Sequence, residues 1–367
     1  MKENVYLDYN ATARIRPEVI SLVTKVMGEV GNASSIHSFG RHARKYVEDA
    51  RAQVAALVGA KPDQVIFNSG ATEGNNTVLA NFRNEPVFIS AIEHPSIMKA
   101  APQARHFPVT QNGVVDLDAL KTLLNDKASP ALICIMLVNN KTGTIQPVKE
   151  ITELAHEKGI KVLCDVAQAA GRIPIDLSYL DVDYMVLSGH KIAGPHGVGA
   201  LILREGTQIE PLITGGGQER NMRAGTLNVA GIAGLGLAAQ LAGENLPAYE
   251  KITELRDHLE HEIRQHTNKA IIYGENAPRV GNTSCLGLSG VPAQTQLMNL
   301  DLEGFAVSSG SACSSGTWKP SHVLTAMGVS EDEAKSALRI SLGWATTSAE
   351  IDAFIEAYKK MADNFSK

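Results

Sequence analysis

The feature that most constrains the fold is a repeated alternation of short apolar runs with helix-length stretches between residues 65 and 203. This order predicts a mainly parallel β-sheet covered by helices. The carboxyl ends of parallel strands share one edge of a sheet, so polar side chains that follow those ends are expected to converge on one ligand. The polar residues at successive expected strand ends are Thr72, His94, Asn140, Asp165, Gln168, Ser188, His190 and Lys191.

Length and composition are those of a large globular protein. The chain has 367 residues, of which 44% are hydrophobic and 20% charged, so a large core is expected. The net charge is −5 and no basic block occurs, which disfavours nucleic acid as a partner. Neither a signal-peptide core nor an apolar run of transmembrane length is visible, so we expect a cytoplasmic protein with no membrane partner.

A change of pattern near residue 245 predicts a domain boundary. A long stretch of small apolar residues, 226–246, gives way to a charged helical stretch, 249–266. We therefore expect a large domain of residues 15–245. Residues 1–14 and 246–367 are expected to form a smaller α+β domain.

Lys191 lies directly after the buried strand expected at 184–187, in the sequence YMVLSGHKIAGPHGVGAL. Burying an ammonium group is costly unless the group is paired or neutralised. An amine with a lowered pKa is what a Schiff base with a carbonyl cofactor requires. The alternative is a solvated loop lysine, which is the commoner case for an isolated lysine.

A phosphate site is indicated where the strand 65–67 runs into the small-residue turn NSGATEGN and then into a helix expected at 77–82. Free N–H groups at a helix start bind anions, and Thr72 adds a hydroxyl. The turn is not a GxxxxGK[ST] loop, so a single phosphate suits it better than a nucleoside triphosphate. A second glycine-rich loop at 215–226 carries Arg220 and Arg223, and suits an anion or a subunit edge.

The four cysteines lack metal-type spacing, and one of them stands apart. Cys313 is flanked almost wholly by Ser, Gly and Ala, which predicts an exposed, mobile loop and leaves a reactive thiol about as probable as an inert one. The others, Cys134, Cys164 and Cys285, carry no such signal. Arg339, in a strand expected at 337–342, is either a carboxylate clamp or a surface ion pair.

Together these parts meet the needs of pyridoxal 5′-phosphate. Its aldehyde requires the lysine, and its phosphate requires the turn. Its ring nitrogen requires a buried carboxylate, for which Asp165 is the candidate. Gln168 can hydrogen-bond the phenolic oxygen, and His94 can stack on the ring.

Ten stretches spanning nearly the whole chain resemble the NifS/IscS-type cysteine desulfurase family, which are fold-type I enzymes of the class V aminotransferase superfamily. The resemblance implies a large domain with a mainly parallel seven-stranded sheet between helices, plus a smaller α+β domain. The Cys313 region resembles the first group of the family, in which this loop is long and mobile. The matching stretches are YLDYNAT, GNASSIHSFGR, SGATEGNN, EHPS, VNNKTGTIQP, DVAQAAGRIPIDL, SGHKIAGPHGVGAL, GGGQERNMRAGTLN, SSGSACSSG and ALRISLGWATT.

The resemblance also implies how the cofactor is held. Lys191 would form the Schiff base, Asp165 would hold the ring nitrogen and His94 would lie over the ring. Thr226 would complete the phosphate site from a second subunit, which implies a homodimer. The other implied cofactor contacts are Ala71, Thr72, Asn140, Gln168, Ser188 and His190.

The implied reaction converts L-cysteine to L-alanine. Asn140 and Arg339 would bind the substrate carboxylate, and Cys313 would take the sulfur as a persulfide. Lys191 and His94 would move protons. The implied partner is an iron–sulfur scaffold or another sulfur-acceptor protein. No firm metal site is implied, apart from Cys313 as a transient ligand of a two-iron, two-sulfur cluster.

Four residues depart from the usual family pattern: Ala13 replaces a threonine, Lys141 a glutamate, Cys164 a histidine and Trp344 an arginine. None removes a group that the chemistry requires, and the apolar strand around Cys164 favours packing over redox use. Two alternatives remain. One is another class V enzyme, such as an aminotransferase or a selenocysteine lyase. The other is a non-catalytic protein that binds the cofactor.

Overall fold

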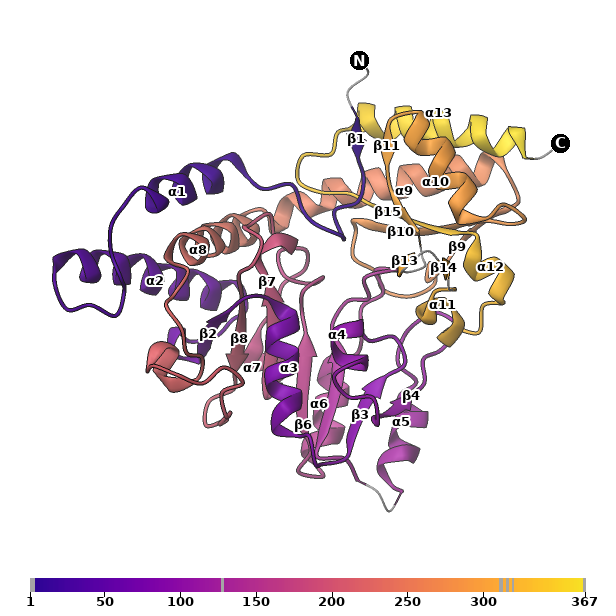
Figure 1. Ribbon diagram of the computed structural model, residues 1–367. Coiled ribbons are helices and arrows are strands. Elements are labelled where there is room, and N and C mark those ends of the chain that lie inside the picture. The colour runs from indigo at the N-terminus through magenta and orange to yellow at the C-terminus, as the bar shows by residue number, and fades with distance from the viewer. Residues whose placement is uncertain (1–3, 127–128, 310–312, 315–316, 319, 366–367) are drawn as a thin grey trace.

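The computed structural model describes residues 4–126, 129–309, 313–314, 317–318 and 320–365 (Figure 1). Its centre is a seven-stranded sheet in which β8 runs against the direction of the other six strands. The expected mainly parallel seven-stranded sheet is therefore confirmed. In spatial order the strands are β2 (Val65–Asn68), β8 (Gly199–Leu203), β7 (Tyr184–Ser188), β6 (Lys161–Asp165), β5 (Leu132–Met136), β3 (Val87–Ser90) and β4 (Arg105–Phe107).

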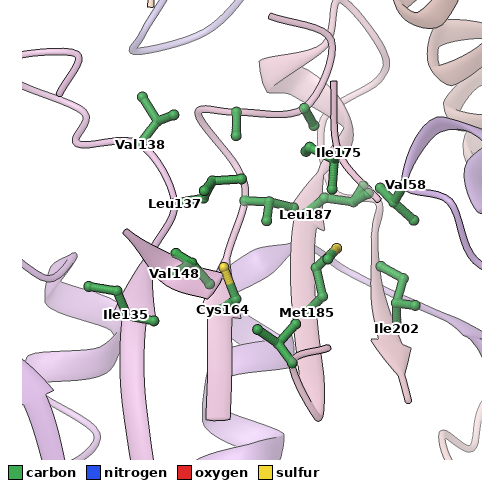
Figure 2. Close-up of a cluster of buried hydrophobic side chains, with 14 of the residues drawn as sticks. Val58, Ile135, Leu137, Val138, Val148, Cys164, Ile175, Met185, Leu187 and Ile202 are labelled. Atoms are coloured by element: carbon green, nitrogen blue, oxygen red, sulfur yellow. The ribbon is translucent and has the colours of Figure 1, made fainter. Parts of the chain in front are cut away.

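Both faces of this sheet are buried, which explains why its strands are apolar throughout rather than alternating. Along β7, Met185 and Leu187 point into the larger hydrophobic core, whereas Tyr184 and Val186 point to the opposite face. Figure 2 shows the larger core, where Cys164 packs beside Met185. Cys164 is fully buried, and burial raises the pKa of its thiol, in agreement with the packing interpretation.

Helices cover the two faces unequally. The face of the larger core is covered by α2, α5, α6, α7 and α8, whereas α3 and α4 cover the other face. The helices of this part are α1 (Pro17–Met27), α2 (Ser38–Leu57), α3 (Ala71–Asn81), α4 (Pro95–Met98), α5 (Leu117–Leu124), α6 (Val148–His156), α7 (Leu177–Leu180) and α8 (Val229–Glu244), with short 3₁₀ turns η1 (Pro62–Gln64), η2 (Gly189–Lys191), η3 (Gln218–Asn221) and η4 (Leu246–Ala248).

A second unit lies at the end of the molecule where both termini emerge (Figure 1). Its four-stranded sheet has the order β12 (Ser308–Ser309), β15 (Ala337–Ser341), β10 (Thr283–Leu288), β9 (Ala270–Ile272). β1 (Val5–Tyr6) pairs in parallel with β11 (Phe305–Ala306). The helices of the C-terminal third are α9 (Tyr249–His266), α10 (Ala293–Leu302), α11 (His322–Ala326), α12 (Glu331–Lys335) and α13 (Ser348–Asn364).

The second unit has its own core. Leu7 from the N-terminus is fully buried there, together with Leu338 and Phe354. The expected domain boundary near residue 245 falls at η4, between α8 and α9. We propose a division at this junction, with the first residues of the chain belonging to the second unit.

The start of α3 and the whole of α10 are among the features that differ from the sequence expectation. The helix expected at 77–82 begins at Ala71, because Gly70, at φ 144°, ends the turn and Glu73 caps the first turn by accepting from the Ser69 N–H. The small residues that suggested a turn are therefore helical. α10 was not predicted, because its polar composition and its exposed Met298 and Leu302 give no clear apolar stripe.

The segment around Cys313 is described only in part. The backbone of β13 (Cys313–Ser314) pairs antiparallel with that of β14 (Thr317–Trp318). Residues 310–312, 315–316 and 319 lie outside the described residues, and so does the predicted exposed, mobile loop that includes them. In the part of the chain that is described, no helix is long and apolar enough to cross a membrane.

The packing of α2 against α8 predicts that replacing two glycines of α8 by alanine has opposite effects on the free energy of unfolding. A Cβ on Gly236 would lie 2.4 Å from Cα of Ala50, whereas a Cβ on Gly243 would lie 3.8 Å from its nearest neighbour, on Leu57. We expect Gly236→Ala to lower the free energy of unfolding by about 1–3 kcal/mol through overpacking. Gly243→Ala should raise it by about 0.5–1 kcal/mol, because alanine is the better helix former. Urea unfolding followed by circular dichroism measures both, and equal effects would contradict the described packing.

Candidate active site

A cavity of about 350 Å³ opens at the carboxyl edge of the large sheet. Residues from β5, β6 and β7 line it together with the start of α3 and the turn before α4. The strand-end side chains expected to converge do share this space, although the role of each stays a prediction. The expected site residues that line the cavity are Ala71, Thr72, His94, Asn140, Asp165, Gln168, Ser188, His190 and Lys191.

Lys191 ends the 3₁₀ turn η2, immediately after the buried strand β7. Its Nζ donates hydrogen bonds to the backbone oxygens of Asn10 at 2.6 Å and Ala11 at 2.8 Å. Burial lowers the pKa of Lys191 to about 7, and the positive charges of Arg172 and Arg339 contribute to that decrease. A substantial fraction of the amine is therefore neutral, and thus nucleophilic, near neutral pH.

Asp165 lies at the end of β6 and is 7% exposed. Its Oδ1 accepts from the N–H of Ala167 at 2.9 Å, and its Oδ2 accepts from Nδ2 of Asn75 at 3.1 Å. Asn75 Nδ2 also donates to Oγ of Ser96 at 2.9 Å, and that hydroxyl lies 2.8 Å from Nδ1 of His94. A hydrogen-bonded chain therefore joins Asp165 to His94 through two neutral side chains.

Sequence analysis missed Asn75 and Ser96 as site residues. Asn75 is fully buried and stands one helical turn after Thr72, so both face the same side of α3. This spacing is a usable signal only when the helix is known to begin at Ala71. Ser96 lies in the quoted EHPS stretch, where it looks like an ordinary turn residue.

His94 is the N-cap of α4, and its Nδ1 accepts from the N–H of Ser96 at 3.1 Å. Burial lowers the pKa of His94, Asp165 opposes this, and Lys191 and Lys141 lower the pKa further. The imidazole is therefore neutral at neutral pH, with Nδ1 as an acceptor and the proton on Nε2.

Glu93, beside His94, is a third residue that sequence analysis missed. It is fully buried, and its Oε1 accepts from the hydroxyl of Ser90 and the N–H of Met136. Burial raises the pKa of Glu93 to about 8, so this carboxyl is mainly protonated at neutral pH. An acidic residue in a turn gives no sequence signal for such burial.

The start of α3 forms an anion cradle. The first N–H groups of a helix have no intrahelical acceptor, and the N-cap Gly70 offers no side chain to satisfy them. Ser188 and His190 line the same cavity, and Oγ of Ser188 would lie 3.3 Å from a Cβ built on Gly70. Burial lowers the pKa of His190 to about 4, and Lys191 and His196 add to this, so the ring is neutral and stacks on His196 with centroids 5.3 Å apart.

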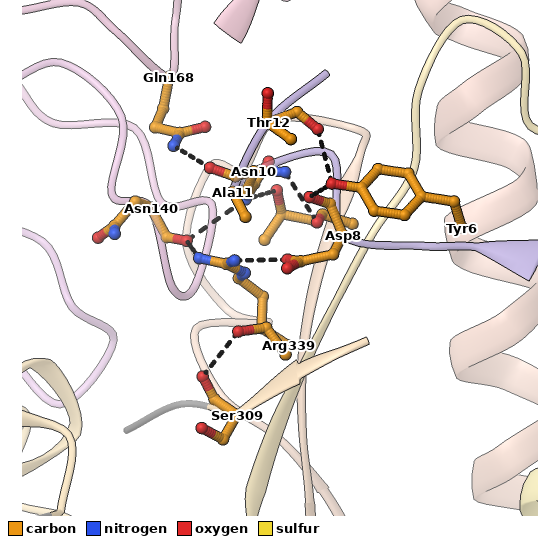
Figure 3. Close-up of polar contacts among 12 residues, drawn as sticks. Tyr6, Asp8, Asn10, Ala11, Thr12, Asn140, Gln168, Ser309 and Arg339 are labelled. Atoms are coloured by element: carbon orange, nitrogen blue, oxygen red, sulfur yellow. Dashed lines mark hydrogen bonds and ion pairs between the residues drawn. The ribbon is translucent and has the colours of Figure 1, made fainter. Parts of the chain in front are cut away.

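Gln168 has both ends of its amide engaged. Its Oε1 accepts from the guanidinium of Arg172. Its Nε2 donates to the backbone oxygen of Asn10 at 3.0 Å, as Figure 3 shows. A guanidinium can only donate, so the amide oxygen must face Arg172. This fixes the Gln168 NH₂ group as the donor on the side of Asn10.

Arg339 is buried rather than on the surface, with 4% exposure. It forms an ion pair with Asp8 at 2.6 Å and donates to the backbone oxygen of Asn140 at 3.1 Å (Figure 3). Its Nε is buried and has no acceptor among the described residues. Arg339 does not line the cavity itself but contacts it through Asn140. The surface ion pair considered for Arg339 is therefore a buried one.

Besides Arg339, one more expected site residue with a described side chain, Thr226, lies outside the lining of this cavity. Thr226 lines a separate hollow that shares only Ser69 and Gly197 with it. The side chain of Cys313 lies outside what the structure describes. Among the described residues, no cluster of three or more His, Cys, Asp or Glu side chains has the geometry of a metal site.

Comparisons with known proteins identify the family of the chain. Residues 5–354 match the family model of class-V aminotransferases. The chain is 39% identical to a protein of Dictyoglomus turgidum named cysteine desulfurase IscS, over 99% of this chain and 95% of that protein. A NifS-like protein from Rickettsia africae has a TM-score of 0.92 and 39% identity, over 98% of this chain and 100% of that one.

A third similar structure is described as SspA in complex with cysteine. It has a TM-score of 0.80 and 29% identity, and covers 92% of this chain and 98% of that one. A family model that spans nearly the whole chain, together with near-complete coverage of relatives at 39% identity, shows the family. The chain belongs to the class-V aminotransferase family, and within it to the NifS/IscS-type cysteine desulfurases.

Proposed function

We propose that this protein is a pyridoxal 5′-phosphate-dependent cysteine desulfurase that converts L-cysteine to L-alanine and transfers the sulfur to Cys313. One observation carries the proposal: the amine of Lys191, with a pKa of about 7, shares a cavity with the nearly buried carboxylate of Asp165 and the start of α3. Relatives named cysteine desulfurases and the cysteine-bound SspA structure support it.

The residues fit the cofactor. Asp165 is held in place by Ala167 and Asn75 and would keep a ring nitrogen protonated. The N–H groups at the start of α3, with Thr72, Ser188 and His190, would bind a phosphate. Gln168 presents N–H donors for a phenolic oxygen. The bound cofactor would supply an electron sink for the α-carbon of the substrate.

The chain itself supplies binding and proton transfer. The Lys191 Nζ, with a pKa near neutrality, is suited to take up and return the α-proton. The His94 Nε2–H is suited to supply the proton that the released carbon takes up, while Nδ1 stays bonded to the Ser96 N–H. By the family resemblance, Asn140 and Arg339 would bind the substrate carboxylate; Asn140 lines the cavity, and Arg339 contacts it through the Asn140 backbone oxygen.

The Cys313 thiolate would attack the sulfur of the substrate. A sulfur–sulfur bond forms, the carbon–sulfur bond breaks, and its electron pair stays on carbon, which a proton then converts to the methyl group of alanine. The sum is enzyme thiol plus cysteine giving enzyme persulfide plus alanine. An aminotransferase needs no such thiol, so Cys313 separates the two candidate activities.

We also propose a homodimer in the cytoplasm that passes its sulfur to an iron–sulfur scaffold or another acceptor protein. Thr226 lies in a neighbouring hollow rather than in the cavity of its own chain. That position supports a role for Thr226 in the cofactor site of a second subunit. The expectation that Cys313 transiently binds a two-iron cluster rests on the family resemblance alone.

Replacing Cys313 by alanine should lower alanine release from L-cysteine, with dithiothreitol present, by about 100-fold or more, because the sulfur acceptor is lost. Absorbance of the bound cofactor should be unchanged. Amino-acid analysis of the reaction measures the alanine, and Ser314→Ala is the matched control. Unreduced alanine release in Cys313→Ala would contradict the desulfurase mechanism, and formation of a keto acid would favour an aminotransferase.

The lowered pKa of Lys191 predicts the pH dependence of cofactor uptake. Cofactor-free protein should take up pyridoxal 5′-phosphate about tenfold more slowly for each pH unit below about pH 7, because only the neutral amine reacts, and should show no further rise above it. Stopped-flow absorbance of the bound cofactor gives the rate. A rate that keeps rising beyond pH 9 would mean that Lys191 keeps its ordinary pKa.

A further inference from the structure

A second cavity, of about 190 Å³, lies on another side of Lys191, between the large domain and the second unit. It shares Lys191 with the candidate active site but none of the other lining residues. Three cationic side chains line it, Arg16, Arg172 and Lys251, together with the amine of Lys191. No Asp or Glu is among its described lining residues, so its electrostatic character is positive.

Arg172 supplies a buried positive charge at this cavity. It is 5% exposed, and its hydrogen-bond partners, Gln168 and the hydroxyl of Tyr249, are both neutral groups. Burial lowers the pKa of Arg172 and no carboxylate offsets this. A buried guanidinium without a counter-charge is costly, and an anion bound beside it would recover part of that cost.

Arg16 supplies a second guanidinium group to the lining of this cavity. It lies over the ring of Trp344, 4.6 Å from the centroid, and Trp344 is held by its own Nε1–H bond to the backbone oxygen of Arg14 at 2.8 Å. Burial raises the pKa of Tyr249, and the positive charges of Arg172 and Arg16 both oppose that rise. Arg16, Arg172 and Tyr249 all line the cavity, and the two guanidinium groups come from distant parts of the chain.

Ala13 and Trp344 both line this cavity. The small side chain of Ala13 takes up little space, and the indole ring of Trp344 adds an apolar wall. Other apolar contacts come from Ala242, Ile252 and Leu255.

We propose that this cavity is a binding site for a small organic carboxylate with an apolar body, held between Arg16 and Arg172. The carboxylate would accept hydrogen bonds from the guanidinium groups and from the hydroxyl of Tyr249, and the body would lie against Trp344. The site is distinct from the proposed substrate position beside Asn140 and Arg339, so it goes beyond the proposed desulfurase reaction.

The test uses the cofactor-loaded protein and benzoate as the probe. The chain has two tryptophans, so Trp318→Phe leaves Trp344 as the only one. Benzoate should change the fluorescence of Trp344 saturably, and benzamide, which has the same shape without the charge, should bind at least tenfold more weakly. Absence of a saturable change, or equal binding of benzamide, would overturn the proposal.

A pair of arginine variants distinguishes benzoate binding in this cavity from general attraction of the anion to positive charge. Arg16→Gln should raise the half-saturating benzoate concentration at least fivefold, and Arg14→Gln, an exposed neighbour that does not line the cavity, should leave it unchanged. Saturation-transfer NMR of benzoate gives the same comparison independently of fluorescence. Equal weakening by both variants would overturn the proposal, and so would loss of binding in Arg339→Gln with no effect of Arg16→Gln. The latter result would place benzoate at the substrate position and leave the desulfurase proposal intact.

Discussion

The site depends on how the chain holds the amine of Lys191 by hydrogen bonds to uncharged groups rather than by an ion pair. Two backbone oxygens, those of Asn10 and Ala11, accept its hydrogen bonds. A carbonyl satisfies an N–H donor but carries no net charge, so it orients the amine without the rise in pKa that a carboxylate would cause. Burial and the nearby guanidinium groups then keep the pKa of Lys191 low. The segment 8–12 is therefore part of the site, although it belongs to no strand of the large sheet.

Much of the fold and of the cavity wall follows from the sequence for a simple physical reason. Strands buried on both faces are apolar runs, as in 132–136 and 184–188, and parallel strands must place their carboxyl ends together. Polar residues after those runs, among them Asp165 and Lys191, are therefore recognisable as neighbours from the order of residues alone. Functional roles and the identity of the cofactor need the family resemblance in addition.

The rest depends on contacts between distant segments, for which periodicity carries no signal. Asp8 and Arg339 are 331 residues apart and form a buried ion pair. The burial of Glu93 follows from its packing beneath β5 rather than from its neighbours in sequence. Asn75 is missed because a run of small polar residues suggests a turn, whereas it forms the first turns of α3. Local propensity is a weak guide where tertiary packing decides.

β1 pairs with β11, and Asp8 pairs with Arg339, so the first residues of the chain depend on partners near its end. This dependence affects how the chain folds during synthesis. The N-terminal segment leaves the ribosome first, whereas the strands that anchor it are made last. A nascent chain that ends before residue 305 contains every strand of the large sheet and the Lys191 and Gln168 side chains that bond Asn10. It lacks β11 and Arg339, which hold β1 and Asp8. The sheet can form during translation as an early folding unit, whereas the catalytic pocket is completed only near the end of synthesis.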